Sequence, residues 1–254
     1  MADNTSVAEE EKKLISRLDD MIELAEKRGA VYSHFLNSHE YAVAENEFRR
    51  RAFKNYCSYG LFENAERKMI CVYKEYFRPE NGEFPMTCIT FDFRKENVLS
   101  HRDFLGAVMA LGIKRDTTGD IVIGEGVAQM AVSDSVKDVV ISNISKIGSV
   151  GVRVCDDVPV KLEKNENFKE LSGTVASMRL DGVISFALNI SRSKAAGLIN
   201  GIGAEVNYFL KNDCSFQLSE GDIFSVKGYG KFRLEEISGV TKKGRIHITV
   251  LKYC

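Results

Sequence analysis

One segment in the last third of the chain constrains the fold most, because it reads as two short helices followed by a tight hairpin. Three apolar residues recur at a spacing of four, which places them on one face of a helix over 179–188: Leu180, Ile184 and Leu188. Asn189 can end this helix because asparagine tolerates the left-handed backbone conformation. Ser191 is suited to cap a second helix, which Gly201 and Gly203 would stop.

Cationic side chains gather at the start of the second predicted helix. Arg192 and Lys194 fall in its first turn, where the helix dipole and unpaired backbone N–H groups already attract anions. This pattern indicates phosphate contact. The candidate RNA-binding residues of the segment are Arg179, Ser191, Arg192, Ser193, Lys194, Asn200, Asn207, Lys227 and Arg233. Asn200 and Asn207 could instead serve turns, and we expect Lys211 and Lys231 to be simply solvated.

The distribution of charge supports an anionic partner for this end of the chain. From Arg179 to the C-terminus, eleven Lys or Arg face seven Asp or Glu, a net charge of +4. The whole chain carries −1, so the preceding 178 residues carry −5. A basic end on an acidic body is typical of a module that binds a polyanion, although a chance imbalance of surface charge would look the same.

The same residues resemble a known small RNA-binding domain. Its pattern occurs here in order and at the right spacing: Arg179-Leu180-Asp181, Ser191-Arg192-Ser193, Leu198-Ile199, Glu205-Val206-Asn207 and Leu218-Ser219-Glu220-Gly221-Asp222-Ile223. This domain is named after ribosomal small-subunit protein four and is also called the alpha-L motif. The chain departs from it at Tyr208, where the family usually has glycine after the asparagine.

Two further motifs resemble the YlmH family of bacterial proteins. They are His101-Arg102-Asp103-Phe104-Leu105-Gly106-Ala107 and the run Leu111-Gly112-Ile113-Lys114-Arg115 with Gly119-Asp120-Ile121. The resemblance covers nearly the full length. It implies RNA binding without known catalysis, association with the ribosome, and a link to the rescue of stalled large subunits.

The first two thirds of the chain predict a helical region and then a mixed domain. Helices are expected over 9–28 and from Ser38 to about Tyr56, the second carrying the basic cluster Arg49-Arg50-Arg51, which is either a solvated face or a secondary RNA contact. From residue 86 the expected order is strand, helix, strand, strand, helix, strand, as in ferredoxin-like and RNA-recognition-motif folds. Phe91 and Phe93 would share one strand face, as core or as a stacking platform.

Several patterns that imitate catalytic or metal sites lack their partners. His101-Arg102-Asp103 imitates a kinase loop without the other kinase motifs. Gly124-Glu125-Gly126 reads as a turn rather than a dinucleotide site. His34 and His39 lack a third metal ligand, and no two of the six cysteines show metal-site spacing. Arg179-Leu180-Asp181 imitates a pseudouridine synthase motif but lies inside the small RNA-binding domain.

The sequence therefore predicts an α+β protein of three parts: a helical N-terminal region over 1–66, a ferredoxin-like middle domain over 67–160 and an alpha-L RNA-binding domain over 171–254. We expect a cytoplasmic monomer without enzymatic activity, cofactor, metal or membrane segment. Its expected partners are structured ribosomal RNA or tRNA and the large ribosomal subunit. The alternatives are an RNA-modifying enzyme with an unrecognised active site in the middle domain, and a protein-interaction adaptor.

Overall fold

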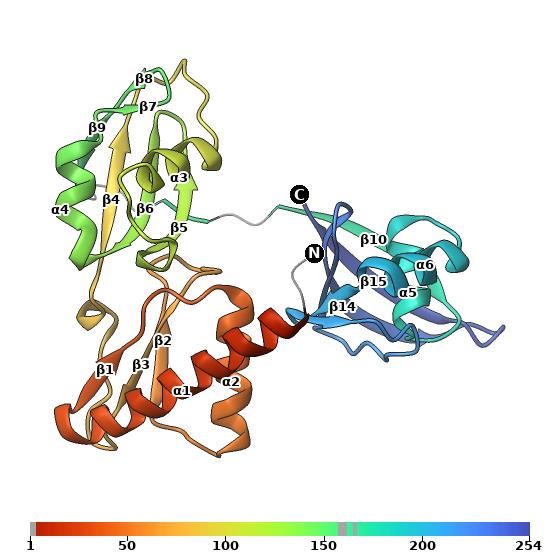
Figure 1. The fold of residues 1–254 in the computed structure, drawn as a ribbon. Helices are drawn as coiled ribbons and strands as arrows, with labels where there is room; N and C mark the ends of the chain where they lie inside the picture. Colours follow the sequence, from red (N-terminus) through yellow and green to blue (C-terminus); the bar gives the residue numbers. More distant parts are fainter. Residues whose placement is uncertain (1–3, 157–161, 165–166) are drawn as a thin grey trace. The chain divides into compact units, whose positions relative to one another are not determined.

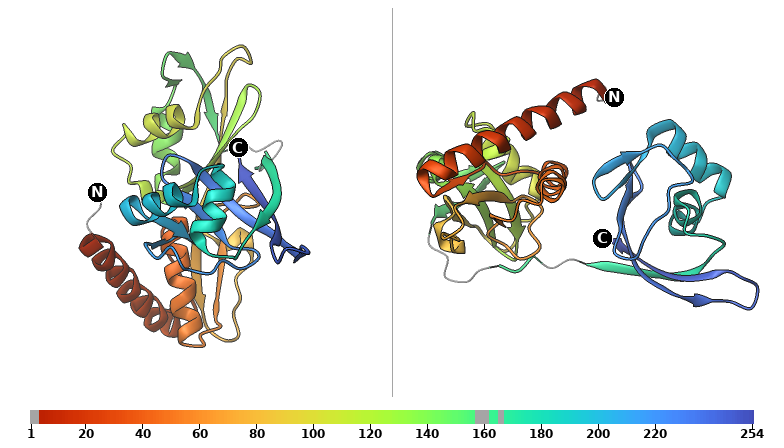
Figure 2. Two further views of the ribbon diagram at one scale, coloured as in Figure 1. Left: turned by 90° about the vertical axis from the view of Figure 1, so that its right-hand side faces the viewer. Right: turned by 90° about the horizontal axis from the view of Figure 1, so that it is seen from below.

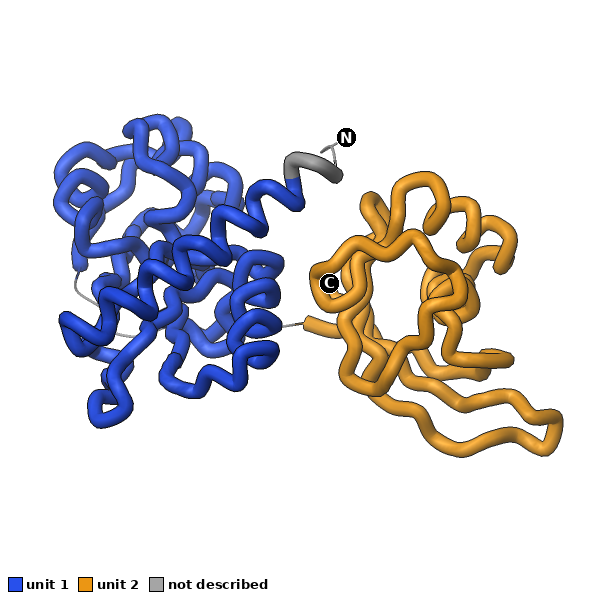
Figure 3. Tube along the Cα trace, turned by 60° about the horizontal axis from the view of Figure 1, so that its bottom comes forward, with its two compact units in different colours: residues 1–164 blue, residues 165–254 orange. Residues whose placement is uncertain are grey.

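A computed structural model describes residues 4–156, 162–164 and 167–254 of the chain (Figure 1). The chain is α+β and forms two compact units, Met1–Lys164 and Asn165–Cys254 (Figure 3). The predicted mixture of helices and strands is confirmed. The predicted three-part division differs from these two units, because the first two predicted parts share a core.

The N-terminal part of the larger unit is a three-stranded antiparallel sheet with two helices. The helices are α1 (Asn4–Arg28) and α2 (Ser38–Arg50). The strands are β1 (Ala30–Tyr32), β2 (Tyr56–Tyr59) and β3 (Met69–Tyr73), in the order β1-β3-β2. Both helices predicted for the region over 1–66 are present, but the prediction missed the strands β1 and β2. Residues 69–73, assigned to the middle domain from the sequence, complete this first sheet.

The second part of the larger unit has the predicted ferredoxin-like order. Its elements are β4 (Met86–Asp92), α3 (His101–Met109), β5 (Thr118–Ile123), β6 (Val127–Ser133), α4 (Asp134–Asn143) and β9 (Arg153–Cys155). The sheet order is β5-β6-β4-β9, and every neighbouring pair is antiparallel. The short pieces η1 (Asn81–Glu83), η2 (Arg115–Thr117), β7 (Lys146–Ile147) and β8 (Val150–Gly151) connect these elements.

Both faces of the four-stranded sheet are covered. One face carries Phe91 and Met130, which are fully buried against Phe104 of α3 and other apolar residues of both helices. Phe91 and Phe93 both contact the ring of Phe104, so the core interpretation of these two residues is confirmed. The opposite face joins a second core to which the N-terminal sheet contributes: Phe35, Met69, Cys71, Cys88, Val122 and Ala131.

A close approach of Phe35 to the backbone of β5 fixes this second core. A Cβ atom on Gly119 would lie 2.7 Å from a ring carbon of Phe35 and 2.8 Å from the Cβ of Ala131. Only glycine leaves room for that ring on the sheet. The guanidinium of Arg67 reinforces the contact by donating to the carbonyls of Phe35 at 3.0 Å and Thr118 at 2.9 Å.

The C-terminal unit is a six-stranded antiparallel sheet with two helices against one face (Figures 1 and 2). The strands are β10 (Phe168–Val175), β11 (Ala204–Val206), β12 (Phe209–Lys211), β13 (Ile223–Val226), β14 (Gly230–Val240) and β15 (Ile246–Tyr253). Their order is β10-β15-β14-β13-β11-β12. The helices are α5 (Leu180–Leu188) and α6 (Arg192–Ile202), close to the predicted ranges.

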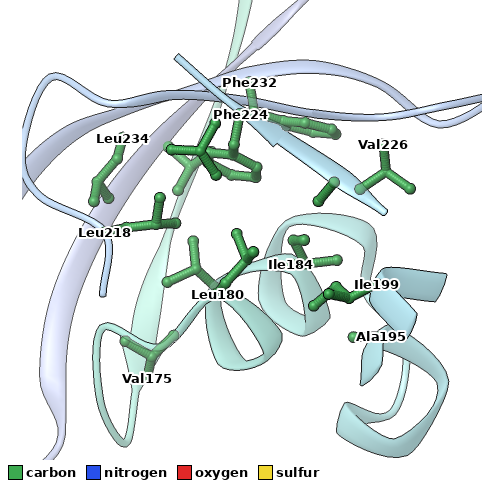
Figure 4. Close-up of a cluster of buried hydrophobic side chains, with 14 of the residues drawn as sticks. Val175, Leu180, Ile184, Ala195, Ile199, Leu218, Phe224, Val226, Phe232 and Leu234 are labelled. Carbon is green, nitrogen blue, oxygen red and sulfur yellow. The ribbon is translucent and has the colours of Figure 1, made fainter. Parts of the chain in front are cut away.

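One apolar cluster holds these helices to the sheet (Figure 4). Leu180 and Ile184 of α5 and Ile199 of α6 point toward the stacked rings of Phe224 and Phe232, whose centroids lie 5.3 Å apart. The predicted apolar spacing is confirmed for the first two residues of the stripe, which are fully buried, whereas Leu188 is only partly buried.

Candidate nucleic-acid interface

The start of α6 has the predicted capped geometry. The Ser191 hydroxyl accepts a hydrogen bond from the backbone N–H of Lys194 at 3.2 Å, as expected of an N-cap residue. Asn189, at the end of α5, has φ +52°, so its predicted left-handed conformation is also confirmed. Ser191, Arg192, Ser193 and Lys194 are all exposed. The first turn therefore presents two cations beside the positive end of the helix.

Asp181 joins the starts of the two helices through two arginines. Its carboxylate accepts from Arg179 at 3.1 Å and from Arg192 at 3.0 Å. Its side chain is only 7% exposed, whereas that of Arg192 is 53% exposed. The carboxylate thus orients both guanidinium groups at the edge of the core. Asp181 is therefore buried and engaged by two arginines inside the C-terminal unit.

The protonation of Asp181 reflects the competition between burial and these two cations. Burial alone would raise its pKa, but the hydrogen bonds from Arg179 and Arg192 outweigh burial and hold the pKa below the ordinary value. The same contact raises the pKa of Arg179. Asp181 is therefore ionised and Arg179 protonated at neutral pH.

Asn207 serves the hairpin turn, one of the two roles that its sequence context allowed. Asn207 and Tyr208 have φ values of +49° and +69° between the paired ends of β11 and β12, which is the pattern of a type I′ turn. The Asn207 amide donates to Asp222 at 2.8 Å and accepts from the N–H of Ile223 at 3.0 Å. Tyr208 therefore occupies a left-handed position where the related domain usually has glycine.

The remaining candidates do not gather at one point. Asn200 is exposed near the end of α6, where its side-chain oxygen accepts a weak contact from the Cys214 thiol at 3.5 Å. Lys227 is exposed in the turn after β13. Arg233 lies on β14 and pairs with Glu235 at 2.6 Å. The structure thus brings Arg179, Arg192 and the first turn of α6 together at the helix starts, whereas Arg233 lies on strand β14.

Sequence reasoning missed the environment of Lys231. We expected this lysine to be simply solvated, but its ammonium lies 4.7 Å from the ring centroid of Tyr253 and 5.4 Å from that of Tyr208. Lys211 likewise lies over the ring of Phe216, at 5.2 Å. Tyr253 belongs to β15 and Tyr208 to the turn between β11 and β12, so the local sequence around Lys231 could not reveal either ring.

The basic cluster on α2 is largely engaged within the larger unit. Arg50 and Arg51 both donate to Glu47, each with a shortest distance of 2.6 Å, and Arg51 also pairs with Asp19 of α1. The hydrogen bonds from Arg50 and Arg51 lower the pKa of Glu47 to about 2 despite its burial. The ion pairs leave Arg50 exposed, as is Arg49, which agrees with a solvated face, whereas Arg51 is partly buried.

The motifs that imitate catalytic sites have local structural roles. Asp103 accepts from the backbone N–H and the hydroxyl of Ser100, both at 2.7 Å, and so caps α3. Gly126 has φ +73° in the turn between β5 and β6, as the turn interpretation of Gly124-Glu125-Gly126 predicts. Within the part of the chain that the structure describes, no three His, Cys, Asp or Glu side chains are arranged to hold a metal ion.

A hollow of about 410 Å³ lies between α1 and the loop before α2. Polar side chains at the start of α2 bind both neighbouring elements. His39 pairs with Glu11 of α1 at 3.0 Å. Glu40 accepts from the backbone N–H of Asn37 at 2.7 Å, which completes the capping box of α2. No helix among the described residues is long and apolar enough to cross a membrane.

The comparison with known proteins gives a direct relative. The chain is 32% identical over 195 residues to ribosome-associated protein quality control protein P2 of Bacillus subtilis (strain 168), covering 75% of each protein. Residues 79–161 match the family model described as "Putative RNA-binding domain in YlmH". The chain belongs to the YlmH family.

A solved structure with a related name also resembles the chain. It is described as the cell division protein ylmH from Streptococcus pneumoniae, and it is 21% identical with a TM-score of 0.48. The match covers 62% of this chain and 92% of that one. The family match lies on the ferredoxin-like part of the larger unit, whereas the residues predicted here to bind RNA lie in the C-terminal unit.

Proposed function

We propose that this YlmH-family protein is a non-enzymatic RNA-binding protein that binds structured ribosomal RNA or tRNA on the large ribosomal subunit. Its proposed setting is ribosome-associated quality control, which the name of the Bacillus relative supports. The family model over 79–161 supports RNA binding as its chemistry. We infer further that residues 171–254 act as an alpha-L domain and that the protein works as a monomer.

The observation that carries the RNA contact is the arrangement at the starts of α5 and α6. Asp181 holds the guanidinium groups of Arg179 and Arg192, and the capped first turn of α6 adds the exposed Lys194. Backbone N–H groups at a helix start and neighbouring cations favour a phosphate for the same electrostatic reason. Contacts of this kind position an RNA backbone without reading its bases.

The test is RNA affinity measured against salt concentration by fluorescence anisotropy, with a labelled hairpin of ribosomal RNA and the full-length protein. Arg192→Ala/Lys194→Ala should weaken binding and reduce the slope of log K against log salt by roughly one to two, because fewer counterions are released. Lys12→Ala/Lys13→Ala removes the same charge from exposed positions of α1 and serves as the control. Unchanged affinity and slope in a folded double variant would refute this phosphate site.

Lys194→Ala separates phosphate contact from the support that Arg192 gives to Asp181. It removes one exposed cation and leaves the Arg179–Asp181–Arg192 cluster intact, so its melting temperature should equal that of the wild type. The absence of enzymatic activity is tested separately. The protein is incubated with ribosomal RNA and common group donors, and a new protein-dependent modified nucleotide found by mass spectrometry would overturn it.

A further inference from the structure

The sheet of the C-terminal unit has a second face, turned away from α5 and α6. Along β14 the buried residues Phe232 and Leu234 alternate with Lys231 and Arg233, which therefore lie on this outer face. The register pairs Lys231 with Ser225 of β13. Because Phe232 pairs with Lys252, Lys231 also stands beside Tyr253 of β15.

Tyr253 in turn pairs with Phe168 of β10, so the row continues across the neighbouring strand. The two rings meet edge to face with their centroids 4.8 Å apart. Four adjacent strands, β13, β14, β15 and β10, thus place their side chains in one row, at the spacing of about 5 Å that separates neighbouring strands.

Two cations of this outer face, Lys231 and Arg233, lie over aromatic rings. Lys231 lies over Tyr253 and Tyr208, and the guanidinium carbon of Arg233 lies 5.2 Å from the ring centroid of Phe168. We call these five residues the aromatic–cation row: Tyr208, Lys231, Arg233, Tyr253 and Phe168. All five are partly exposed rather than buried. The row is therefore a preformed surface of rings and positive charge.

Three carboxylates lie on the same face and accept hydrogen bonds within it, among them Glu170, which accepts from the Ser172 hydroxyl at 3.0 Å. Glu235 accepts from the Arg233 Nε at 2.6 Å, which holds the guanidinium plane in place, and Glu205 accepts from the Ser225 hydroxyl at 3.2 Å. Rings and guanidinium planes bind the flat faces of nucleobases, and ammonium groups attract the phosphates between them.

We propose that the aromatic–cation row binds a single-stranded segment of RNA by stacking its bases. The inference rests on the proposed RNA-binding function but uses a different surface and a different chemistry from the start of α6. The helix start contacts the phosphates of a structured RNA, whereas the outer face of the sheet takes unpaired nucleotides with little preference for sequence.

The test uses the full-length protein and a 12-nucleotide oligoadenylate carrying one 2-aminopurine, whose fluorescence reports stacking. Phe168→Leu/Tyr253→Leu changes no charge but removes two rings, and it should lower affinity for this strand about tenfold or more. Arg233→Lys keeps the charge and removes the planar guanidinium, so it should also weaken binding. Lys169→Met is a control on the opposite face of the sheet, because Lys169 pairs with Lys252, the partner of Phe232; it removes a charge but no ring, so base stacking should be unchanged.

The outcomes separate this inference from the proposed function. The proposed stacking site would be overturned if the protein binds the ribosomal hairpin and the ring variants bind the single strand as tightly as the wild type does. The proposed function would then still stand. Wild-type protein that binds the hairpin but neither binds the oligoadenylate nor changes the 2-aminopurine fluorescence would also overturn it. If the double variant melts early, Tyr253→Leu and Arg233→Lys decide the question singly. Failure of the wild type to bind either RNA would overturn both.

Discussion

The guanidinium of Arg192 lies 3.0 Å from the carboxylate of Asp181, which connects the first turn of α6 to the first turn of α5. The same carboxylate binds Arg179, so one buried anion orients both arginines of the proposed phosphate site. The Asp181 carboxylate therefore both orients the proposed phosphate site and stabilises the C-terminal unit.

We expect Asp181→Asn to lower the free energy of unfolding at pH 7 by about 1–2 kcal/mol, because charge-assisted hydrogen bonds weaken and Arg192 is half exposed. The folded pKa is depressed, so the contribution is complete above the unfolded value of about 3.9 and is lost as the pH falls through the folded pKa. Urea denaturation followed by circular dichroism at pH 7 and pH 3 measures the difference. Asp138→Asn, at an exposed position of α4, is the control. A cost that does not shrink at low pH would contradict the linkage.

Glu47 should show the same pH dependence in the larger unit. Glu47→Gln removes the anion that binds Arg50 and Arg51, and we expect a loss of about 1–3 kcal/mol at neutral pH. Because the pKa of Glu47 is lowered to about 2, its contribution is complete above about pH 4.5 and falls away toward pH 2. Denaturation curves at pH 7 and pH 3 check this, with Glu23→Gln at an exposed position of α1 as the comparison. Equal stability of Glu47→Gln and wild type at pH 7 would refute it.

Gly119→Ala should destabilise the larger unit by about 1–3 kcal/mol through overpacking. The new methyl group would meet the ring of Phe35 at 2.7 Å and the Cβ of Ala131 at 2.8 Å. Gly82→Ala is the matched control, because nothing lies within 4 Å of its added Cβ. Thermal melts of both variants test the contact. A further Phe35→Leu substitution should reduce the cost of Gly119→Ala, and full additivity of the two changes would show that the ring is not the obstacle.

Two substitutions distinguish a turn role from an RNA-binding role for Asn207. Asn207→Ala keeps a Cβ at φ +49° but removes the side-chain amide that bonds to Asp222 and Ile223, so it should cost about 1–2 kcal/mol. Asn207→Gly keeps the turn available and should cost less. Affinity for the ribosomal hairpin should stay at the wild-type level in Asn207→Gly. A clear loss of affinity in this folded variant would assign Asn207 to the RNA.

Local signals made the C-terminal helices predictable. Asn189 and Ser191 determine where α5 ends and α6 begins through interactions with residues a few positions away, and such interactions are visible in the sequence. The ferredoxin-like order was also predictable, because each of its elements has its own hydrophobic period and turn signals.

Pairing between distant segments was not predictable. Strand β1 has only three residues, Ala30–Tyr32, and follows directly after a long helix, so no periodicity reveals it. Residues Met69–Tyr73 fell within the predicted middle domain, but they pair with β1 and β2, which both precede them in the sequence. Lys231 was misinterpreted for the same reason: the ring of Tyr253 reaches it only through the pairing of β14 with β15.

Because Phe35 packs directly on Gly119, the ferredoxin-like part of this chain cannot be transferred to another protein as an independent domain. Related folds that bind RNA through their sheet carry the binding rings on an open face, but here that face is interior and has Cys88 and Ala131 buried in it. A gene fragment beginning at residue 79, where the family match starts, would encode every ferredoxin-like strand yet leave an apolar wall facing water. A fusion or recombinant protein that uses the ferredoxin-like part would therefore also need roughly the first seventy residues of this chain.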